Sequence, residues 1–157
     1  METSEMEFGG SGIEKKLYDW IKENIPFGDT IIEFGAGDVS TRALAEHWEL
    51  YSVEDNAQWI NRWNSNYIYA PVVNGWYDIA IVKPALPLSY SLVIVDGPSG
   101  AGNRGGILDH LSMFRGDVPI VIDDTWRDQE RFLAAIMATK MGKFVEDYGQ
   151  YSILVNK

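Results

Sequence analysis

Apolar residues along the chain alternate between the period of a strand and the period of a helix. Five runs predict β-strands, at about 30–34, 50–53, 67–73, 91–95 and 118–122. Stretches near 40–48, 56–63, 104–115 and 127–141 are compatible with helices, and residues 13–24 carry apolar side chains at helical spacing. Strands that alternate with helices predict a parallel sheet covered by helices.

The end of the chain has a different pattern. Residues 143–157, KFVEDYGQYSILVNK, form two strand-like runs joined by a Tyr-Gly-Gln turn, which predicts a terminal antiparallel hairpin. Together with the five earlier strands this gives a mostly parallel α/β sheet of seven strands. A length of 157 residues suits one domain, which we place at 13–157 behind a flexible tail at 1–12.

Composition narrows the functional classes. A formal charge of -10 without a run of Lys or Arg argues against nucleic acid or a membrane surface as partner. The chain has no apolar stretch near 18 residues, and an acidic, polar start replaces the basic and then apolar start of a signal peptide. We therefore expect a cytoplasmic protein. The chain contains no cysteine and two histidines, so carboxylates are the natural metal ligands. The oligomeric state, including a homo-oligomer, stays open.

A glycine-containing loop follows the first predicted strand, in IIEFGAGDVST at 31–41. Gly35 and Gly37 allow a tight turn and a close approach of the backbone to a ligand. A carboxylate at the end of the next strand, Glu54 or its neighbour Asp55, could accept both hydroxyls of a ribose. The pattern indicates an adenosine-type cofactor. Because Ser40 stands where G-x-G-x-x-G has its third glycine, a nicotinamide-dependent oxidoreductase is a weaker alternative.

Three further carboxylates follow the fourth and fifth predicted strands. Asp96 ends SLVIVD, and Asp123 and Asp124 end PIVIDD. Parallel strands place their carboxyl ends at one edge of the sheet, so we expect these side chains to converge there. Unpaired, they would repel and raise one another's pKa, and a divalent cation or a bound proton would relieve this. An all-oxygen ligand set favours Mg²⁺, followed by Mn²⁺.

The order of these elements resembles class I S-adenosylmethionine-dependent methyltransferases, and the resemblance spans nearly the whole chain. Glu33, Gly35 and Gly37 match the family's acid-x-Gly-x-Gly signature, and Ser40-Thr41 resembles a subset with Gly-x-x-Ser-Thr. The resemblance implies a Rossmann-like fold with helices on both faces and S-adenosylmethionine as cofactor. It implies the following cofactor-binding residues: Ser11, Glu33, Gly35, Ala36, Gly37, Ser40, Thr41, Glu54, Asp55, Trp76 and Asp96.

Within this set the resemblance implies distinct roles. Gly35 to Gly37 border the methionine part of the cofactor, with Glu33 near its amino group, and Glu54 holds the ribose. Trp76 either stacks on adenine or packs in the core. Ser11 lies where many relatives place a hydroxyl near the cofactor carboxylate.

Two narrower resemblances concern the acceptor side. Asp96 with Asp123-Asp124 is similar to metal-dependent catechol-type O-methyltransferases, whose Asp-Asn pair appears here as Asp-Asp. Asp96-Gly97-Pro98, Asn103-Arg104-Gly105-Gly106 and Asp-x-x-Arg-x-x-Glu at 124–130 resemble the glucuronoxylan 4-O-methyltransferase family. They imply O-methylation of a small molecule or a sugar, with Asp96, Asp124 and Arg104 as catalytic residues and Asp96, Asp123 and Asp124 as metal ligands.

Two questions stay open at this point. Arg104 could bind a substrate carboxylate, or Arg104 and Arg127 could neutralise Asp96, Asp123 and Glu130 as structural ion pairs. The protein could also bind S-adenosylmethionine or S-adenosylhomocysteine without turnover, as a sensor or a subunit. The convergent carboxylates favour an enzyme, because a binding protein gains nothing from repelling charges on the acceptor side.

Overall fold

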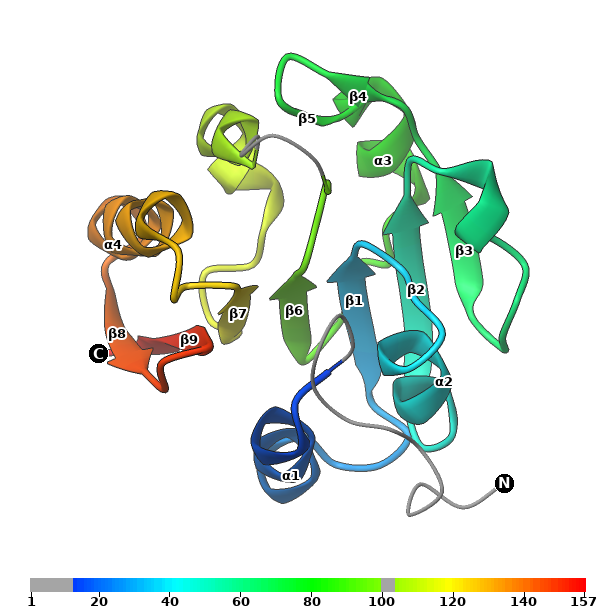
Figure 1. Cartoon of the computed structure of the whole chain (residues 1–157), viewed down its shortest axis with the longest axis horizontal. Coiled ribbons are helices and arrows are strands. Elements are labelled where there is room, and N and C mark those ends of the chain that lie inside the picture. Colours follow the sequence, from blue (N-terminus) through cyan, green and yellow to red (C-terminus); the bar gives the residue numbers. More distant parts are fainter. Residues whose placement is uncertain (1–12, 100–103) are drawn as a thin grey trace.

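The computed structural model describes residues 13–99 and 104–157, and its centre is a seven-stranded sheet (Figure 1). The strand order is β3-β2-β1-β6-β7-β9-β8, in which β9 is antiparallel to both β7 and β8 and the other neighbours are parallel. The strands are β1 (Thr30–Phe34), β2 (Glu49–Glu54), β3 (Asn66–Tyr69), β6 (Leu92–Val95), β7 (Ile120–Asp123), β8 (Lys143–Asp147) and β9 (Tyr151–Asn156). The predicted α/β sheet with its terminal antiparallel hairpin is confirmed.

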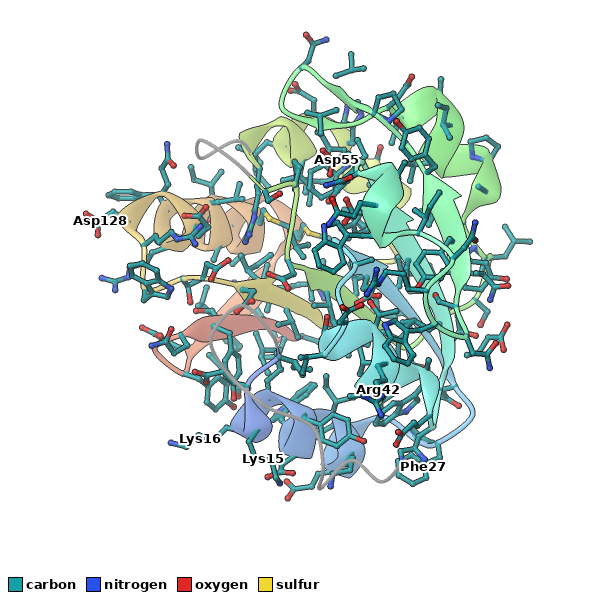
Figure 2. The ribbon with its side chains drawn as sticks, turned by 45° about the vertical axis from the view of Figure 1, so that its right-hand side comes forward. Lys15, Lys16, Phe27, Arg42, Asp55 and Asp128 are labelled. Carbon is teal, nitrogen blue, oxygen red and sulfur yellow. The ribbon has the colours of Figure 1, made fainter. Side chains whose placement is uncertain are left out.

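Helices cover both faces of the sheet, as predicted. On one face, α1 (Lys15–Asn24) and α2 (Ser40–Ala45) pack against Ile31 and its neighbours. On the other face, Ile32 and Phe34 pack with side chains of α3 (Ile79–Ala85), η3 (Gly105–Met113) and α4 (Asp128–Met141). This division follows from the alternation of side chains along a strand. Figure 2 shows Lys15 and Lys16 of α1 pointing away from the sheet.

Two predicted helices and one strand differ from expectation. The helix predicted at 56–63 is only a 3₁₀ turn, η2 (Ala57–Trp59), because the backbone is extended at Ile60 and left-handed at Asn61 (φ 59°). The helix near 104–115 is the 3₁₀ segment η3, which is interrupted at His110. The strand predicted at 67–73 divides at Pro71, which has no N–H for the ladder.

A small hairpin lies beyond this division. Strand β4 (Val72–Val73) pairs antiparallel with β5 (Trp76–Tyr77) across Asn74-Gly75, both of which have positive φ. Asn-Gly is the preferred dipeptide for such a two-residue turn. The hairpin matters for the site because it buries Trp76 and Tyr77. The following helix α3 was not predicted, although Asp78 caps it by accepting the Ala80 N–H.

Within the described residues, no helix combines the length and the apolar character that crossing a membrane requires.

Candidate functional site

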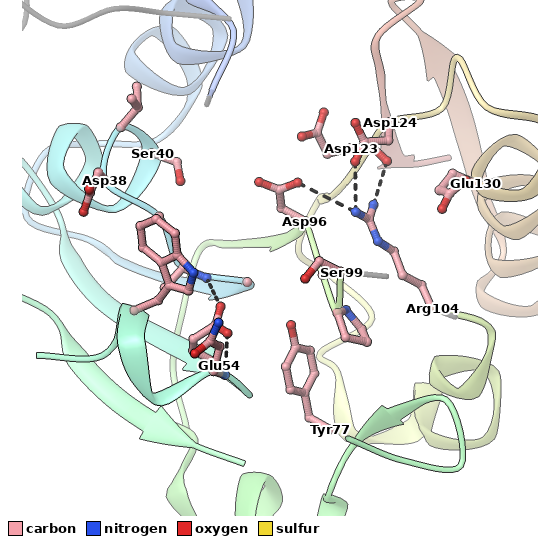
Figure 3. Close-up of a pocket in the computed structure, with 18 of the residues that line it drawn as sticks. Asp38, Ser40, Glu54, Tyr77, Asp96, Ser99, Arg104, Asp123, Asp124 and Glu130 are labelled. Atoms are coloured by element: carbon pink, nitrogen blue, oxygen red, sulfur yellow. Dashed lines mark hydrogen bonds and ion pairs between the residues drawn. The ribbon is translucent and has the colours of Figure 1, made fainter. Parts of the chain in front are cut away.

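A cavity of about 690 Å³ opens where β1, β2, β6 and β7 end (Figure 3). Its volume lies in the range of small-molecule and cofactor sites. One half is lined by the loop after β1 and by residues that follow β2: Gly35, Ala36, Gly37, Asp38, Val39, Ser40, Glu54, Asn56 and Trp59. The other half is lined by residues after β6 and β7, with Tyr77 from the small hairpin: Asp96, Gly97, Pro98, Ser99, Arg104, Asp123, Asp124, Arg127 and Glu130.

The register of the strands brings the two halves together. Phe34 is paired with Val95, and Val95 is paired with Ile122, so the loop after β1 meets Asp96 and Asp96 meets Asp123. Gly35 has φ +100°, and a Cβ on it would lie 2.8 Å from the carbonyl oxygen of Asp96. A glycine is therefore required here both by its conformation and by the close approach of the β6 end.

Glu54 lies at the end of β2 and faces the cavity. It is 6% exposed, and its two carboxylate oxygens accept the backbone N–H groups of Ala36 (2.9 Å) and Asn56 (2.7 Å). Burial raises the pKa of Glu54, which the two backbone N–H groups counteract. Each oxygen retains a lone pair with which it can accept a ligand hydroxyl. Asp55, the alternative in the sequence, is absent from the lining of this cavity.

Glu33 lies behind the glycine loop and does not line the cavity. Its Oε2 accepts the hydroxyls of Thr41 (2.5 Å) and Ser52 (2.6 Å), and Thr41 in turn accepts the Gly37 N–H (2.9 Å). Complete burial raises the pKa of Glu33 to about 7. Glu33 and Thr41 thus support the loop, whereas Ser40 contributes to the cavity wall.

The predicted aromatic platform lies elsewhere. Trp76 is fully buried and packs on Phe34, with ring centroids 4.9 Å apart, so its position matches the packing alternative and not the stacking one. Ser11 lies outside the described residues. Trp59 on η2 lines the cavity instead, and its segment is joined to the glycine loop by Arg62, which donates to both oxygens of Asp38 (2.6 and 2.8 Å). The sequence signal that could have identified Trp59 is its position shortly after Glu54, the carboxylate at the end of β2.

The three aspartates converge as expected. Carboxylate oxygens of Asp96, Asp123 and Asp124 all lie within 4.8 Å of one another. Burial and the neighbouring carboxylate of Asp123 raise the pKa of Asp96 well above its ordinary value, and burial also raises the pKa of Asp123. Asp124 has φ 63°, an uncommon conformation for a residue other than glycine.

Arginines supply counter-charge next to this cluster (Figure 3). The Nη2 of Arg104, a residue only 5% exposed, lies 2.9 Å from Asp124 Oδ2 and 3.9 Å from Asp96 Oδ1, and its Nη1 donates to the Asp123 carbonyl oxygen (3.0 Å). Arg127 lies 3.8 Å from Asp124. The ion-pair alternative for both arginines therefore has a geometric basis. The two guanidinium groups also offset part of the negative charge of the three aspartates. A metal ion is therefore less necessary than the repulsion between the carboxylates alone implied.

Two further polar residues of the cavity each have a buried atom without a hydrogen bond in the described part of the chain. The hydroxyl of Tyr77 and the Oε2 of Glu130 are buried without a hydrogen-bond partner among the residues that the structure describes. Burial raises the pKa of Tyr77, so its hydroxyl stays protonated and able to donate. Sequence patterns give no sign that these atoms are unpaired, because this depends on what surrounds them.

Scans against protein-family models and curated protein sequences find no match. Several solved structures have a similar fold. The MycE methyltransferase from the mycinamycin biosynthetic pathway, in complex with Mg, SAH and mycinamycin VI, shares 14% identity over 90% of this chain with a TM-score of 0.60. This chain covers 45% of MycE, or about half its length.

Two other similar structures match this chain over nearly their whole length. The C-terminal domain of precorrin-6Y C5,15-methyltransferase from Rhodobacter capsulatus has 14% identity and a TM-score of 0.60, with 98% of both chains covered. An rRNA methylase from Streptococcus thermophilus has 11% identity and a TM-score of 0.58, with 90% of this chain and 94% of that chain covered. At these identities the likeness concerns the fold alone: the chain has the Rossmann-like α/β fold of these methyltransferase structures.

Proposed function

We propose that the protein is an S-adenosylmethionine-dependent methyltransferase that methylates a hydroxyl of a small molecule or a sugar. One observation carries the proposal: a single cavity joins the glycine loop and Glu54 to the cluster of Asp96, Asp123, Asp124 and Arg104. The first half suits a nucleoside cofactor, and the second half offers carboxylates for an acceptor hydroxyl. The similar methyltransferase structures support this assignment.

In the cofactor half, Glu54 accepts the ribose hydroxyls, and the backbone from Gly35 to Gly37 borders the methionine part. Trp59 offers a ring for adenine, the role first considered for Trp76, since bases stack readily on aromatic side chains. Asp96 would lie on the methyl-donor side of such a cofactor, because Gly35 and Asp96 are adjacent. The residues expected to contact the cofactor therefore lie at or just after the ends of β1 and β2 and in η2.

In the acceptor half, the protein has to align the acceptor oxygen with the methyl group and accept its proton. Alignment at a separation of about 3–3.5 Å supplies much of the rate enhancement in such transfers. Asp96 is the proposed general base, because its raised pKa makes its carboxylate a stronger base than that of an ordinary aspartate. Arg104 holds Asp124 and the end of β7 in place and stabilises the charge left on the cluster.

A divalent cation fits the same residues. Asp96, Asp123 and Asp124 offer three oxygen ligands, the type that Mg²⁺ and Mn²⁺ prefer. Such an ion would lower the pKa of an acceptor hydroxyl. The ion would have to share Asp124 with the Arg104 guanidinium at 2.9 Å.

Calorimetric titration tests the proposal. Wild-type protein is titrated with S-adenosylmethionine and S-adenosylhomocysteine, with and without Mg²⁺ or Mn²⁺, beside Asp96→Asn and the exposed control Asp109→Asn. We expect micromolar nucleoside binding in all three proteins and metal binding that Asp96→Asn abolishes. If neither nucleoside binds, the cofactor assignment fails. If NAD binds in their place, the oxidoreductase alternative replaces it.

Activity separates an enzyme from a non-catalytic binding protein. Transfer of a labelled methyl group to uronic acids, neutral sugars and catechols is measured for the same proteins. Nucleoside binding that survives Asp96→Asn, together with transfer that this substitution abolishes, would support the enzyme. Nucleoside binding without transfer to any acceptor would favour a sensor or a subunit.

A further inference from the structure

Glu130 is a buried carboxyl that neither the cofactor half nor the acid cluster uses. It lies in the first turn of α4, is 3% exposed, and lines the cavity. Its Oε1 is 3.8 Å from Arg127 Nη1, too long for a hydrogen bond, and its Oε2 has no hydrogen-bond partner among the described residues. A buried unpaired carboxylate oxygen is costly, so its position beside a cavity indicates that a ligand completes it.

The charges around Glu130 decide what kind of ligand this can be. Four carboxyl groups face this half of the cavity, those of Asp96, Asp123, Asp124 and Glu130, against the two guanidinium groups of Arg104 and Arg127. Both arginines already lie within 3.9 Å of carboxylates of the protein. A carboxylate on the acceptor would find no unengaged cation among the lining residues and would be repelled by the remaining acids.

We propose that Glu130 binds a hydrogen-bond donor of the methyl acceptor, and that acceptors of this protein are neutral or cationic molecules with a hydroxyl or ammonium group besides the hydroxyl that is methylated. The inference rests on the proposed methyltransferase function and defines its substrate class. It decides against the acidic sugar that Arg104 alone would suit.

The arrangement of the cavity separates the two groups of the acceptor. In Figure 3, Glu130 lies beyond Arg104, on the opposite side of the cavity from Glu54, and the hydroxyl of Tyr77 points into the space between them. The reacting hydroxyl lies beside Asp96, next to the cofactor half. A hydrogen-bond donor at Glu130 therefore belongs to a part of the acceptor that is remote from the transferred methyl group. Its hydrogen bond to Glu130 fixes the orientation of the acceptor.

Three matched probes test the proposal: methyl glucoside, methyl glucosaminide and methyl glucuronide, which are neutral, cationic and anionic. Binding to the S-adenosylhomocysteine complex is followed by NMR, and labelled methyl transfer is measured in parallel. In wild type we expect the neutral and cationic probes to bind at least tenfold more tightly than the anionic probe. Glu130→Gln should reduce the tenfold advantage of the cationic probe over the anionic probe, whereas the exposed control Glu46→Gln should retain it.

Each other result overturns the proposal. Equal or tighter binding of the glucuronide excludes the charge argument, and this comparison needs no variant. An unchanged preference in Glu130→Gln, with S-adenosylhomocysteine affinity within twofold of wild type, removes Glu130 from the acceptor site. Failure of all three probes to bind shows that a hydroxyl or ammonium donor is not what this half recognises. If the Glu130 inference fails, the proposed function still stands as long as wild type binds S-adenosylhomocysteine. If wild type does not bind it, the inference and the proposed function both fail.

Discussion

Glu54 is the residue on which cofactor affinity should depend most directly. Its carboxylate already accepts two backbone N–H groups, and we propose that it also accepts the ribose hydroxyls. Hydrogen bonds to charged groups contribute about 1.5–3 kcal/mol, so Glu54→Gln should weaken S-adenosylhomocysteine binding by about 10- to 100-fold in calorimetry. The exposed Glu46→Gln is the control. A dissociation constant within twofold of wild type would contradict the assignment.

Tyr77 is a residue whose truncation should stabilise the protein. Because its buried hydroxyl lacks a described partner, Tyr77→Phe should raise the free energy of unfolding of the ligand-free protein by about 1 kcal/mol, measured by urea unfolding. Tyr90 is the matched control: its hydroxyl accepts the Arg115 N–H at 2.7 Å, so Tyr90→Phe should lower that free energy by about as much. Destabilisation by Tyr77→Phe would show that the hydroxyl is satisfied in solution.

At the scale of elements, the junction of the glycine loop with β6 holds the two halves of the cavity together. Gly35→Ala places a Cβ 2.8 Å from the Asp96 carbonyl oxygen and also forces alanine to φ +100°. Gly28→Ala is the matched control, since Gly28 has φ +92° but no atom within 4 Å of its added Cβ. Positive φ alone costs about 1–2 kcal/mol, and overpacking adds about 1–3 kcal/mol.

Urea unfolding of the two glycine variants separates these contributions. Gly35→Ala should lose at least about 1 kcal/mol more than Gly28→Ala, and it alone should lose S-adenosylhomocysteine binding. Equal losses of stability in both variants would mean that the loop moves away from β6 without cost.

Helix positions were predicted less well than strand positions. Trp59 and Trp63 are spaced as on a helix at 56–63. The segment instead adopts a conformation in which the Trp63 indole N–H donates to Asp38 in the loop after β1 (3.1 Å). The short helix α3 was missed because its seven residues provide barely two turns of periodicity. The first error concerns a segment that makes a tertiary contact, and the second concerns a helix too short to show its period.

At the scale of the whole molecule, the buried Glu33 should make stability depend on pH. Burial raises its pKa from 4.5 to about 7, so between these values the folded state binds more protons than the unfolded state. Stability contributed by the protonated group is therefore complete below about pH 4.5 and is lost as pH rises through 7. The total is on the order of 3 kcal/mol.

Glu33→Gln isolates this contribution from those of the other carboxyls. The free energy of unfolding of this variant should rise relative to that of wild type as pH increases from 5, most steeply at about pH 5 to 6.5, and the difference should level off above about pH 7. Urea unfolding at four pH values measures the difference, with Glu46→Gln as control for the substitution. A constant difference across this range would mean that Glu33 does not titrate there.

The sequence by itself determined the order of the main-sheet strands along the chain, the terminal hairpin and the loop glycines, because periodicity and backbone freedom are local properties. It also determined that Asp96, Asp123 and Asp124 would converge, since parallel strands end at one edge. Tertiary structure alone decided that Glu54 and not Asp55 faces the cavity, that Trp76 is core while Trp59 lines the site, and that arginines partly neutralise the cluster. It alone left the Tyr77 hydroxyl and one Glu130 oxygen without a hydrogen-bond partner among the described residues, because burial and the supply of partners are set by groups distant in sequence.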